Sequence, residues 1–162
     1  MSFTAIARGW KAKALAAMVA VATIFGMMQF AAPEEANAHR GWLRPGCSWD
    51  TYNYWLQYCQ VYSHAMGKDI TVQIRPGIAP GSPGLYLLDG LRARDDWSEY
   101  VWTAHAPALF EHDNITLAMP VGGEASFYTD WNGPAINSKG EIRNYKWETF
   151  LTQELPHYLD VH

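Results

Sequence analysis

Two short apolar runs restrict the fold more than any other feature of the sequence. Leu85–Leu88 and Ile115–Val121 are almost continuously apolar, and each stops at a turn that contains glycine. Short runs of this kind are typical of strands that are buried on both faces of a parallel sheet. Residues 97–110 lie between the runs and are long enough for a crossover helix, although Pro107 lies inside them. The pattern predicts a β-α-β unit within an α/β fold.

The flanking segments extend this prediction on both sides. His39–Tyr62 is crowded with aromatic residues and is interpreted as strand or packed loop, whereas Asp69–Ile74 alternates polar and apolar residues as a half-buried strand does. Tyr145–Tyr158 has apolar residues at helical spacing, and Pro156 is expected to kink or loosen its last turn. The glycine-containing loop 122–144 would then follow a parallel strand, where open α/β sheets bind their ligands.

The N-terminus has the pattern of an export signal. A basic stretch precedes the uncharged run Ala14–Ala32, and Ala36–Ala38 matches a small-x-small cleavage site. The 19 uncharged residues approach the length of a spanning helix, so a retained membrane anchor is the alternative. We predict a cleaved signal peptide over residues 1–38 and one exported domain over 39–162, without stable membrane insertion after cleavage.

Composition and charge exclude several classes of protein. The chain is 49% hydrophobic and 14% aromatic, which is incompatible with disorder, and its two cysteines are too few for a multi-disulfide scaffold. The net charge of −4 provides no basic excess for neutralising phosphates, so no nucleic-acid partner is expected. Small molecules and proteins remain as partners.

Cys47 and Cys59 both lie in the part of the chain that is predicted to be exported. Two nearby cysteines usually pair in an oxidising compartment, so a structural disulfide is expected. A metal site or a thiol nucleophile is the alternative, but there is no third cysteine and no histidine at ligand spacing. Four histidines of the predicted domain are scattered without metal spacing: His64, His105, His112 and His157. Neither a metal nor a cofactor is expected.

Four blocks of the sequence carry a resemblance to a known family. They are Leu85–Asp96, Met119–Gly123, Ser126–Trp131 and Tyr145–Pro156. Together they closely resemble the secreted mycolyltransferases of the antigen 85 type, found in the envelope of actinobacteria that carry mycolic acids, and the resemblance runs from about Tyr62 to Leu159. It implies an α/β-hydrolase fold, a serine nucleophile with glutamate and histidine partners, and transfer of mycolyl groups between trehalose esters or onto cell-wall arabinogalactan.

The nucleophile of that family is not found in these 162 residues. An α/β-hydrolase carries its serine on a G-x-S-x-G elbow, and the acid and the histidine follow later in the chain. The sequence has no such motif, and Ser82 lies in a proline-rich loop with the wrong spacing. We therefore expect the triad to lie beyond His162. The fold would be the N-terminal half of an α/β-hydrolase without its elbow strand, and this chain alone would be inactive.

The resemblance assigns a role to three residues that this chain retains. Asp89 and Arg92 match residues that bind the trehalose sugar, and the backbone N–H of Leu91 matches one donor of the oxyanion hole. A fixed amide stabilises the charge that acyl transfer develops on a carbonyl oxygen, and charged groups suit sugar hydroxyls. The alternative is that Asp89 is a plain turn residue before Gly90 and that Arg92 is a solvated surface charge.

Other features of the family's site are less defined in this sequence. Thr103 stands where the family usually has a sugar-binding asparagine, so the acceptor preference need not follow the family. Phe127, Tyr128 and Trp131 either line an acyl or sugar site or pack beside the glycine-containing loop.

These observations support more than one function. The first is an exported acyltransferase of the cell envelope, with trehalose mycolates and cell-wall arabinogalactan as its partners. The alternative is a non-catalytic envelope protein that binds a trehalose glycolipid or a host or matrix protein. An inactive truncated remnant is the third hypothesis.

Overall fold

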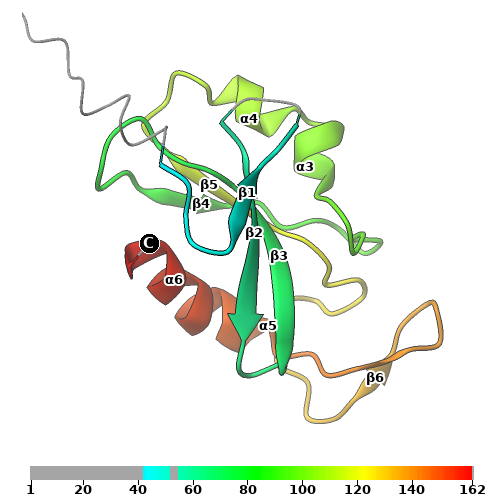
Figure 1. The fold of residues 1–162 in the computed structure, drawn as a ribbon. Coiled ribbons are helices and arrows are strands. Elements are labelled where there is room, and N and C mark those ends of the chain that lie inside the picture. The colour runs from blue at the N-terminus through cyan, green and yellow to red at the C-terminus, as the bar shows by residue number, and fades with distance from the viewer. Residues whose placement is uncertain (1–41, 52–54, 162) are drawn as a thin grey trace, which may run out of the picture. The chain divides into compact units, whose positions relative to one another are not determined.

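A five-stranded mixed sheet forms the centre of the fold, in the strand order β1-β2-β3-β5-β4 (Figure 1). The computed structural model describes residues 42–51 and 55–161, and the predicted signal peptide, residues 1–38, lies outside them. The strands of this sheet are β1 (Cys47–Trp49), β2 (Gln57–Ser63), β3 (Lys68–Arg75), β4 (Gly84–Tyr86) and β5 (Thr116–Pro120). The pairs β1–β2, β2–β3 and β3–β5 are antiparallel, whereas β4 pairs with β5 in parallel.

The parallel pair β4 and β5 confirms the predicted β-α-β unit. All five residues of β5 are buried, as expected of an interior strand. The expectation that Leu85–Leu88 is buried on both faces was wrong, because β4 is shorter than that run and its residues are half-buried or exposed. Among the described residues β4 pairs with β5 alone, so it lies at the edge of the sheet.

The predicted crossover helix is divided into two short helices, α3 (Glu99–Trp102) and α4 (Ala106–Leu109). Pro107 lies in the first turn of α4, where a residue without a backbone N–H leaves no hydrogen bond unmade. His105, directly before α4, has a left-handed backbone with a φ of 51°. A single helix is therefore broken at His105, and Pro107 lies in the first turn of the second one.

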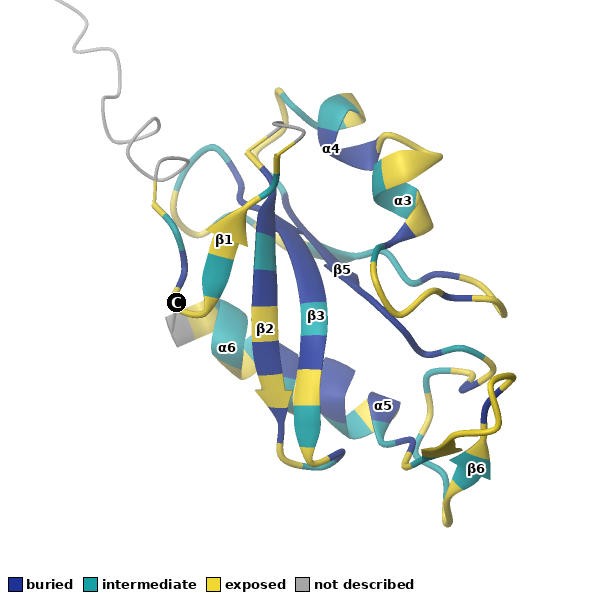
Figure 2. Cartoon of the chain, turned by 45° about the vertical axis from the view of Figure 1, so that its right-hand side comes forward, coloured by how far each residue is buried: buried dark blue, intermediate teal, exposed yellow. Residues whose placement is uncertain are grey.

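The two faces of the sheet carry separate hydrophobic cores (Figure 2). On one face, Ala118 of β5 and the apolar residues of β2 and β3 pack against the C-terminal helix. On the other face, Leu117 and Met119 of β5 pack with Ala106 and with residues of α3. Successive residues of a strand point to opposite faces, so β5 contributes to both cores and has no exposed side.

The C-terminal helix consists of α5 (Trp147–Thr149), a π-helical turn η1 (Phe150–Glu154) and α6 (Leu155–Val161). The predicted helix Tyr145–Tyr158 thus begins two residues later, and it continues past Tyr158. The N–H of Leu155 donates to the carbonyl of Phe150, five residues earlier. Pro156 follows at once, and its ring would clash with the carbonyl four residues before it in a regular α-helix. The wide turn before Pro156 accommodates the ring, so the proline deforms the helix without ending it.

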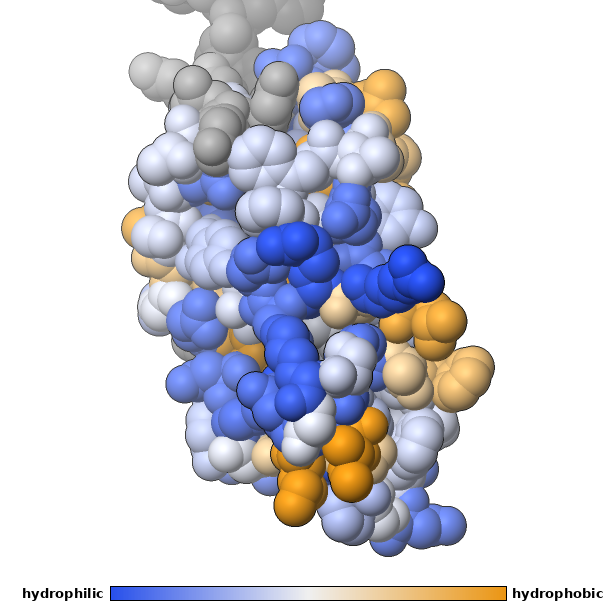
Figure 3. Space-filling view, turned by 90° about the vertical axis from the view of Figure 1, so that its right-hand side faces the viewer, coloured by the Kyte–Doolittle hydropathy of each residue, from blue (hydrophilic) through white to orange (hydrophobic). Residues whose placement is uncertain are grey.

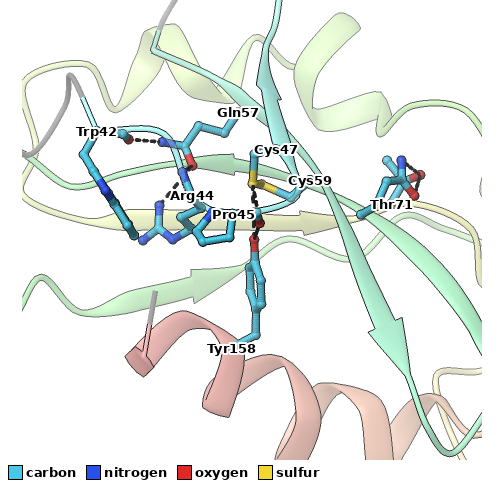
Figure 4. The surroundings of a disulfide bond; sticks show 9 residues. Trp42, Arg44, Pro45, Cys47, Gln57, Cys59, Thr71 and Tyr158 are labelled. Carbon is cyan, nitrogen blue, oxygen red and sulfur yellow. Dashed lines mark hydrogen bonds between the residues drawn. A yellow bond between two sulfur atoms is a disulfide. The ribbon is translucent and has the colours of Figure 1, made fainter.

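The predicted disulfide is confirmed: Cys47 and Cys59 are bonded to each other and occupy directly opposite positions on β1 and β2 (Figure 4). Tyr158 of α6 lies beside the bond, and its hydroxyl donates to the carbonyl of Pro45 at 3.0 Å. The N-terminal strand is therefore fastened both to the sheet and to the C-terminal helix. Neither sulfur remains as a thiol for a metal or for nucleophilic attack.

A small hairpin stands apart from the main sheet. It consists of β6 (Ala135–Ile136) and β7 (Ile142–Arg143), within the loop that was predicted after β5. Ile136 and Ile142 lie opposite each other and are exposed. Figure 3 shows this side of the molecule, where hydrophobic side chains gather at its lower end. No helix in the described part of the chain is both long and apolar enough to cross a membrane.

Candidate functional site

The turn after β4 carries the residues that the sequence assigned to the site. The N–H of Ala93 donates to the carbonyl of Gly90 at 3.0 Å, which places Leu91 and Arg92 at the centre of the turn. Leu91 is 67% exposed, and its N–H has no hydrogen-bond acceptor among residues 42–51 and 55–161. The guanidinium of Arg92 likewise forms no ion pair with any described carboxylate. Both groups are free to meet a ligand.

Asp89 differs from Leu91 and Arg92, because it is buried, with only 4% of the residue exposed. Its carboxylate accepts a hydrogen bond from Ser98 Oγ at 3.1 Å and from the N–H of Glu99 at 3.1 and 3.2 Å. Ser98 in turn caps α3 by accepting from the N–H of Tyr100 at 3.2 Å. Asp89 therefore fastens the turn after β4 to the first turn of α3. That it also binds a sugar stays a prediction.

Burial raises the pKa of the Asp89 carboxyl above its ordinary value of 3.8, and the hydrogen bonds from Ser98 and Glu99 oppose part of that rise. Desolvation disfavours the charged form of an acid, while donors favour it. The folded protein therefore holds the Asp89 proton more tightly than the unfolded chain does.

We expect this difference to appear in the pH dependence of stability. For an acid whose pKa is raised by folding, the stabilisation is fully present below the unfolded pKa and is lost as pH rises through the folded value. The free energy of unfolding of the wild type should thus fall, relative to that of Asp89→Asn, as pH rises from 3.8 to the raised value. Denaturant titrations of both proteins across this range test the prediction, and parallel pH profiles would contradict it.

A second loop, residues 122–131, holds the turn in place. The hydroxyl of Tyr128 donates to the carbonyl of Asp89 at 2.9 Å and lies 3.3 Å from that of Gly122. The N–H of Ala125 donates to the carbonyl of Leu91 at 3.1 Å. Burial raises the pKa of the Tyr128 hydroxyl, and the charge of Asp89 raises it further, so this group stays a donor at neutral pH. The two loops act as one unit.

Gly123 is required where the second loop passes the Tyr128 ring. Its φ is +84°, and a Cβ added there would lie 2.7 Å from Tyr128 Cε1. Gly140 has a similar φ of +79° but nothing within 4 Å of an added Cβ.

We expect Gly123→Ala to destabilise the protein more than Gly140→Ala does. Both variants bear the strain of a left-handed residue, about 1–2 kcal/mol, whereas only the first adds overpacking of about 1–3 kcal/mol. The difference should appear in the free energy of unfolding from urea titrations. Equal losses in the two variants would show that the Tyr128 ring moves aside without cost.

Arg92 belongs to a group of charged residues beside the turn. They line a cavity of about 420 Å³ together with Ala93 and Ser138, and they are Arg92, Arg94, Asp95, Asp96, Glu124 and Lys139. Lys139 Nζ pairs with Asp95 at 2.8 Å, and Arg94 pairs with Asp96 at 2.7 Å while its guanidinium lies 4.0 Å from the centre of the Trp97 ring. Arg92 is thus the cation of this group that is not already occupied.

The side-chain hydroxyls of Ser82, Ser126 and Thr103 all form hydrogen bonds within the protein. Ser82 Oγ lies 2.6 Å from Thr116 Oγ1, and Ser126 Oγ, which is buried, donates to the carbonyl of Gly123 at 2.7 Å. Thr103 Oγ1 donates to Glu99 Oε2 at 2.5 Å, within α3 and its C-cap. Across the described residues no hydrogen bond joins a serine to a histidine, and no three potential ligands gather for a metal ion.

Two positioning residues were missed by the sequence reasoning. Ser98 directly precedes a helix and a glutamate, a pattern that is typical of an N-cap and could have predicted its role. Tyr128 was predicted either to line an acyl or sugar site or to pack beside the glycine-containing loop, without a role for its hydroxyl. Nothing local indicates that its hydroxyl reaches a carbonyl 39 residues earlier.

Comparisons with known proteins identify the family and several relatives of this chain. Residues 63–162 match the model of the family Esterase, described as "Putative esterase". The diacylglycerol acyltransferase/mycolyltransferase Ag85B of Mycobacterium intracellulare is 43% identical over 155 residues, which are 94% of this chain and 43% of that protein. The corresponding Ag85A of Mycobacterium leprae is 52% identical over 104 residues, 64% of this chain and 31% of that protein.

A solved structure supports the fold. The crystal structure of Mycobacterium tuberculosis MPT51 (FbpC1) superimposes with a TM-score of 0.56 at 32% identity, covering 66% of this chain and 36% of that one. The chain therefore spans less than half the length of these relatives. The predicted α/β-hydrolase fold and the resemblance to the mycolyltransferases are confirmed. From the match over residues 63–162, we conclude that the chain belongs to the esterase family.

Proposed function

We propose that this chain provides the oxyanion and sugar-contact part of an acyltransferase that moves mycolyl groups between trehalose esters and onto cell-wall arabinogalactan. The observation that carries the proposal is the turn after β4, which presents the unpaired N–H of Leu91 beside the unpaired guanidinium of Arg92. The relatives named as mycolyltransferases support the choice of acyl group.

The chemistry of acyl transfer accounts for this arrangement. Attack on an ester carbonyl develops negative charge on its oxygen, and an amide N–H that is fixed in advance stabilises that charge. The Leu91 N–H is fixed because the turn closes at Ala93 and because the Leu91 carbonyl accepts from Ala125. Arg92 can donate several hydrogen bonds to the hydroxyls of one sugar. The proposal assigns no nucleophile to residues 1–162, since they contain no G-x-S-x-G motif.

The proposed place of action is the cell envelope. The N-terminal export signal and the disulfide support secretion from a mycolic-acid-bearing actinobacterium, with the signal peptide 1–38 removed and the domain 39–162 retained. A non-catalytic protein that binds a trehalose glycolipid is the second candidate. It would need only a sugar-contact residue such as Arg92, whose guanidinium forms no ion pair with a described carboxylate.

A chimeric enzyme tests the acyltransferase proposal. Residues 63–162 would replace the aligned segment of Ag85B from Mycobacterium intracellulare, which supplies the remainder of that protein. We expect this chimera to transfer mycolyl groups between trehalose monomycolates. A folded chimera without transfer would contradict the proposal, and trehalose binding by the original chain would then favour the second candidate.

In the same chimera we expect Arg92→Ala to reduce transfer from the trehalose ester about 10- to 100-fold, since hydrogen bonds to a charged group contribute about 1.5–3 kcal/mol. Hydrolysis of an activated ester without a sugar should change little, because the guanidinium moves no proton. Arg94→Ala is the matched control, as Arg94 is already paired with Asp96 and packed on Trp97. Equal effects of the two substitutions would remove Arg92 from the site.

A further inference from the structure

A second hollow, of about 220 Å³, adjoins the turn and shares no lining residue with the charged cavity around Arg92. It is formed by both loops of the site, and its lining is Asp89, Gly90, Leu91, Gly123, Ala125, Phe127 and Tyr128. Phe127 is 82% exposed, the highest value among the exposed large hydrophobic side chains of the described residues. An exposed aromatic ring therefore shares this hollow with the proposed oxyanion donor.

The polar side chains of the hollow are already occupied. The Asp89 carboxylate accepts from Ser98 and Glu99, and the Tyr128 hydroxyl bonds the carbonyls of Asp89 and Gly122. The remaining side chains of the lining are those of Leu91, Ala125 and Phe127, all of which are apolar. The hollow therefore offers few free hydrogen-bonding side chains to a sugar, whereas its apolar side chains can contact a hydrocarbon chain.

The backbone that presents Phe127 is held in an unfavourable conformation. Ala125, Phe127 and Tyr128 have φ values of 54°, 56° and 51°, a region that costs a residue with a side chain about 1–3 kcal/mol. Three hydrogen bonds fix this shape: Ser126 Oγ donates to Gly123 O, Tyr128 N–H to Ser126 Oγ, and Trp131 Nε1 to Ser126 O. Backbone strain that neighbours maintain in this way is concentrated at ligand sites.

We propose that Leu91, Ala125 and Phe127 bind the first part of the hydrocarbon chain of the acyl group. This proposal rests on the proposed function, since it takes the Leu91 N–H as the place of the ester carbonyl oxygen. From a carbonyl at Leu91, the acyl chain can continue directly into the adjoining hollow, while the sugar lies on the side of Arg92. The turn would thus separate the two halves of a glycolipid ester by their polarity.

The test of this site is the binding of simple esters. The protein is expressed in an actinobacterial host and purified in the form that this host produces. The probes are the methyl esters of butanoic, hexanoic and octanoic acid, and trehalose, each followed by saturation-transfer NMR of the ligand. We expect affinity to rise about two- to fourfold for each added methylene until the hollow is filled, because a buried methylene contributes about 0.8 kcal/mol. Phe127→Ser should weaken octanoate ester binding at least fivefold.

Two variants serve as controls. Phe127→Leu keeps an apolar side chain and should stay within about twofold of the wild type. Leu109→Ser removes a side chain on α4 that is 73% exposed and lies outside the hollow, and it should change nothing. Circular dichroism of each variant verifies that it is folded.

Several results would overturn the proposal. They are undetectable ester binding by the wild type, affinity independent of chain length, equal affinity in wild type and Phe127→Ser, or a loss of trehalose binding instead of ester binding in Phe127→Ser. The last result would make Phe127 a sugar platform. Failure of the chimera to transfer mycolyl groups, with chain-length-dependent binding intact, would instead reject the proposed function and leave an alkyl-binding site.

Discussion

Residues 1–162 by themselves are expected to hydrolyse no activated ester above the buffer rate. Ester hydrolysis by this family's chemistry needs a serine that is activated by a histidine, and residues 1–162 contain no G-x-S-x-G motif. Ser82 is hydrogen-bonded to Thr116, and Ser126 is hydrogen-bonded to the carbonyl of Gly123. Neither serine forms a hydrogen bond with a described histidine. Without a nucleophile no tetrahedral intermediate forms, and the oxyanion donor then has nothing to stabilise. We therefore expect no esterase activity at all.

Release of p-nitrophenol from a p-nitrophenyl ester measures this directly. The chimera described above is the positive control, since the remainder of Ag85B is present in it. Turnover by the full chain that Ser82→Ala or Ser126→Ala abolishes would contradict the prediction. Turnover that survives both substitutions would point to a contaminating esterase.

We expect Trp147→Ala to lower the free energy of unfolding more than any other single substitution among the residues that hold the two loops of the site. Trp147 is 1% exposed and packs against the rings of Phe150 and Tyr128, with centroid distances of 5.8 and 5.4 Å. Removing a buried tryptophan side chain costs about 3–5 kcal/mol, because it leaves a cavity that the neighbours fill only in part. That is a large share of the total free energy of unfolding, which is roughly 5–15 kcal/mol for a native protein.

The substitution should also loosen the loop that carries Phe127, since Trp147 supports Tyr128 and lies beside Gly122. Trp147→Phe should cost less, as it keeps a ring and removes an indole N–H that has no partner among the described residues. Trp49→Ala, on the exposed edge strand β1, is the surface control and should cost about 1 kcal/mol or less. Urea titrations give the three free energies, and equal losses for Trp147→Ala and Trp49→Ala would refute this account of the core.

The elements with a strong local pattern could be predicted from the sequence. The apolar run Ile115–Val121 contains β5, the alternation in Asp69–Ile74 lies within β3, and the helical spacing of Tyr145–Tyr158 matches most of α5, η1 and α6. The disulfide followed from two cysteines in a segment that is predicted to be exported. Each of these inferences needs only residues that are neighbours in the chain, since hydrophobic periodicity records which face of a strand or helix is covered.

The sequence by itself thus determined the β-α-β unit, the C-terminal helix, the disulfide and the position of the turn with Leu91 and Arg92. Only the tertiary structure decided that β4 pairs with β5 alone among the described residues, that Asp89 fastens α3, and that Tyr128 holds the turn from the following loop. The physical reason is that strand order and buried hydrogen bonds depend on groups brought together by folding. A buried carboxylate or hydroxyl takes whichever partner the packed chain places within reach, and no local pattern records that partner.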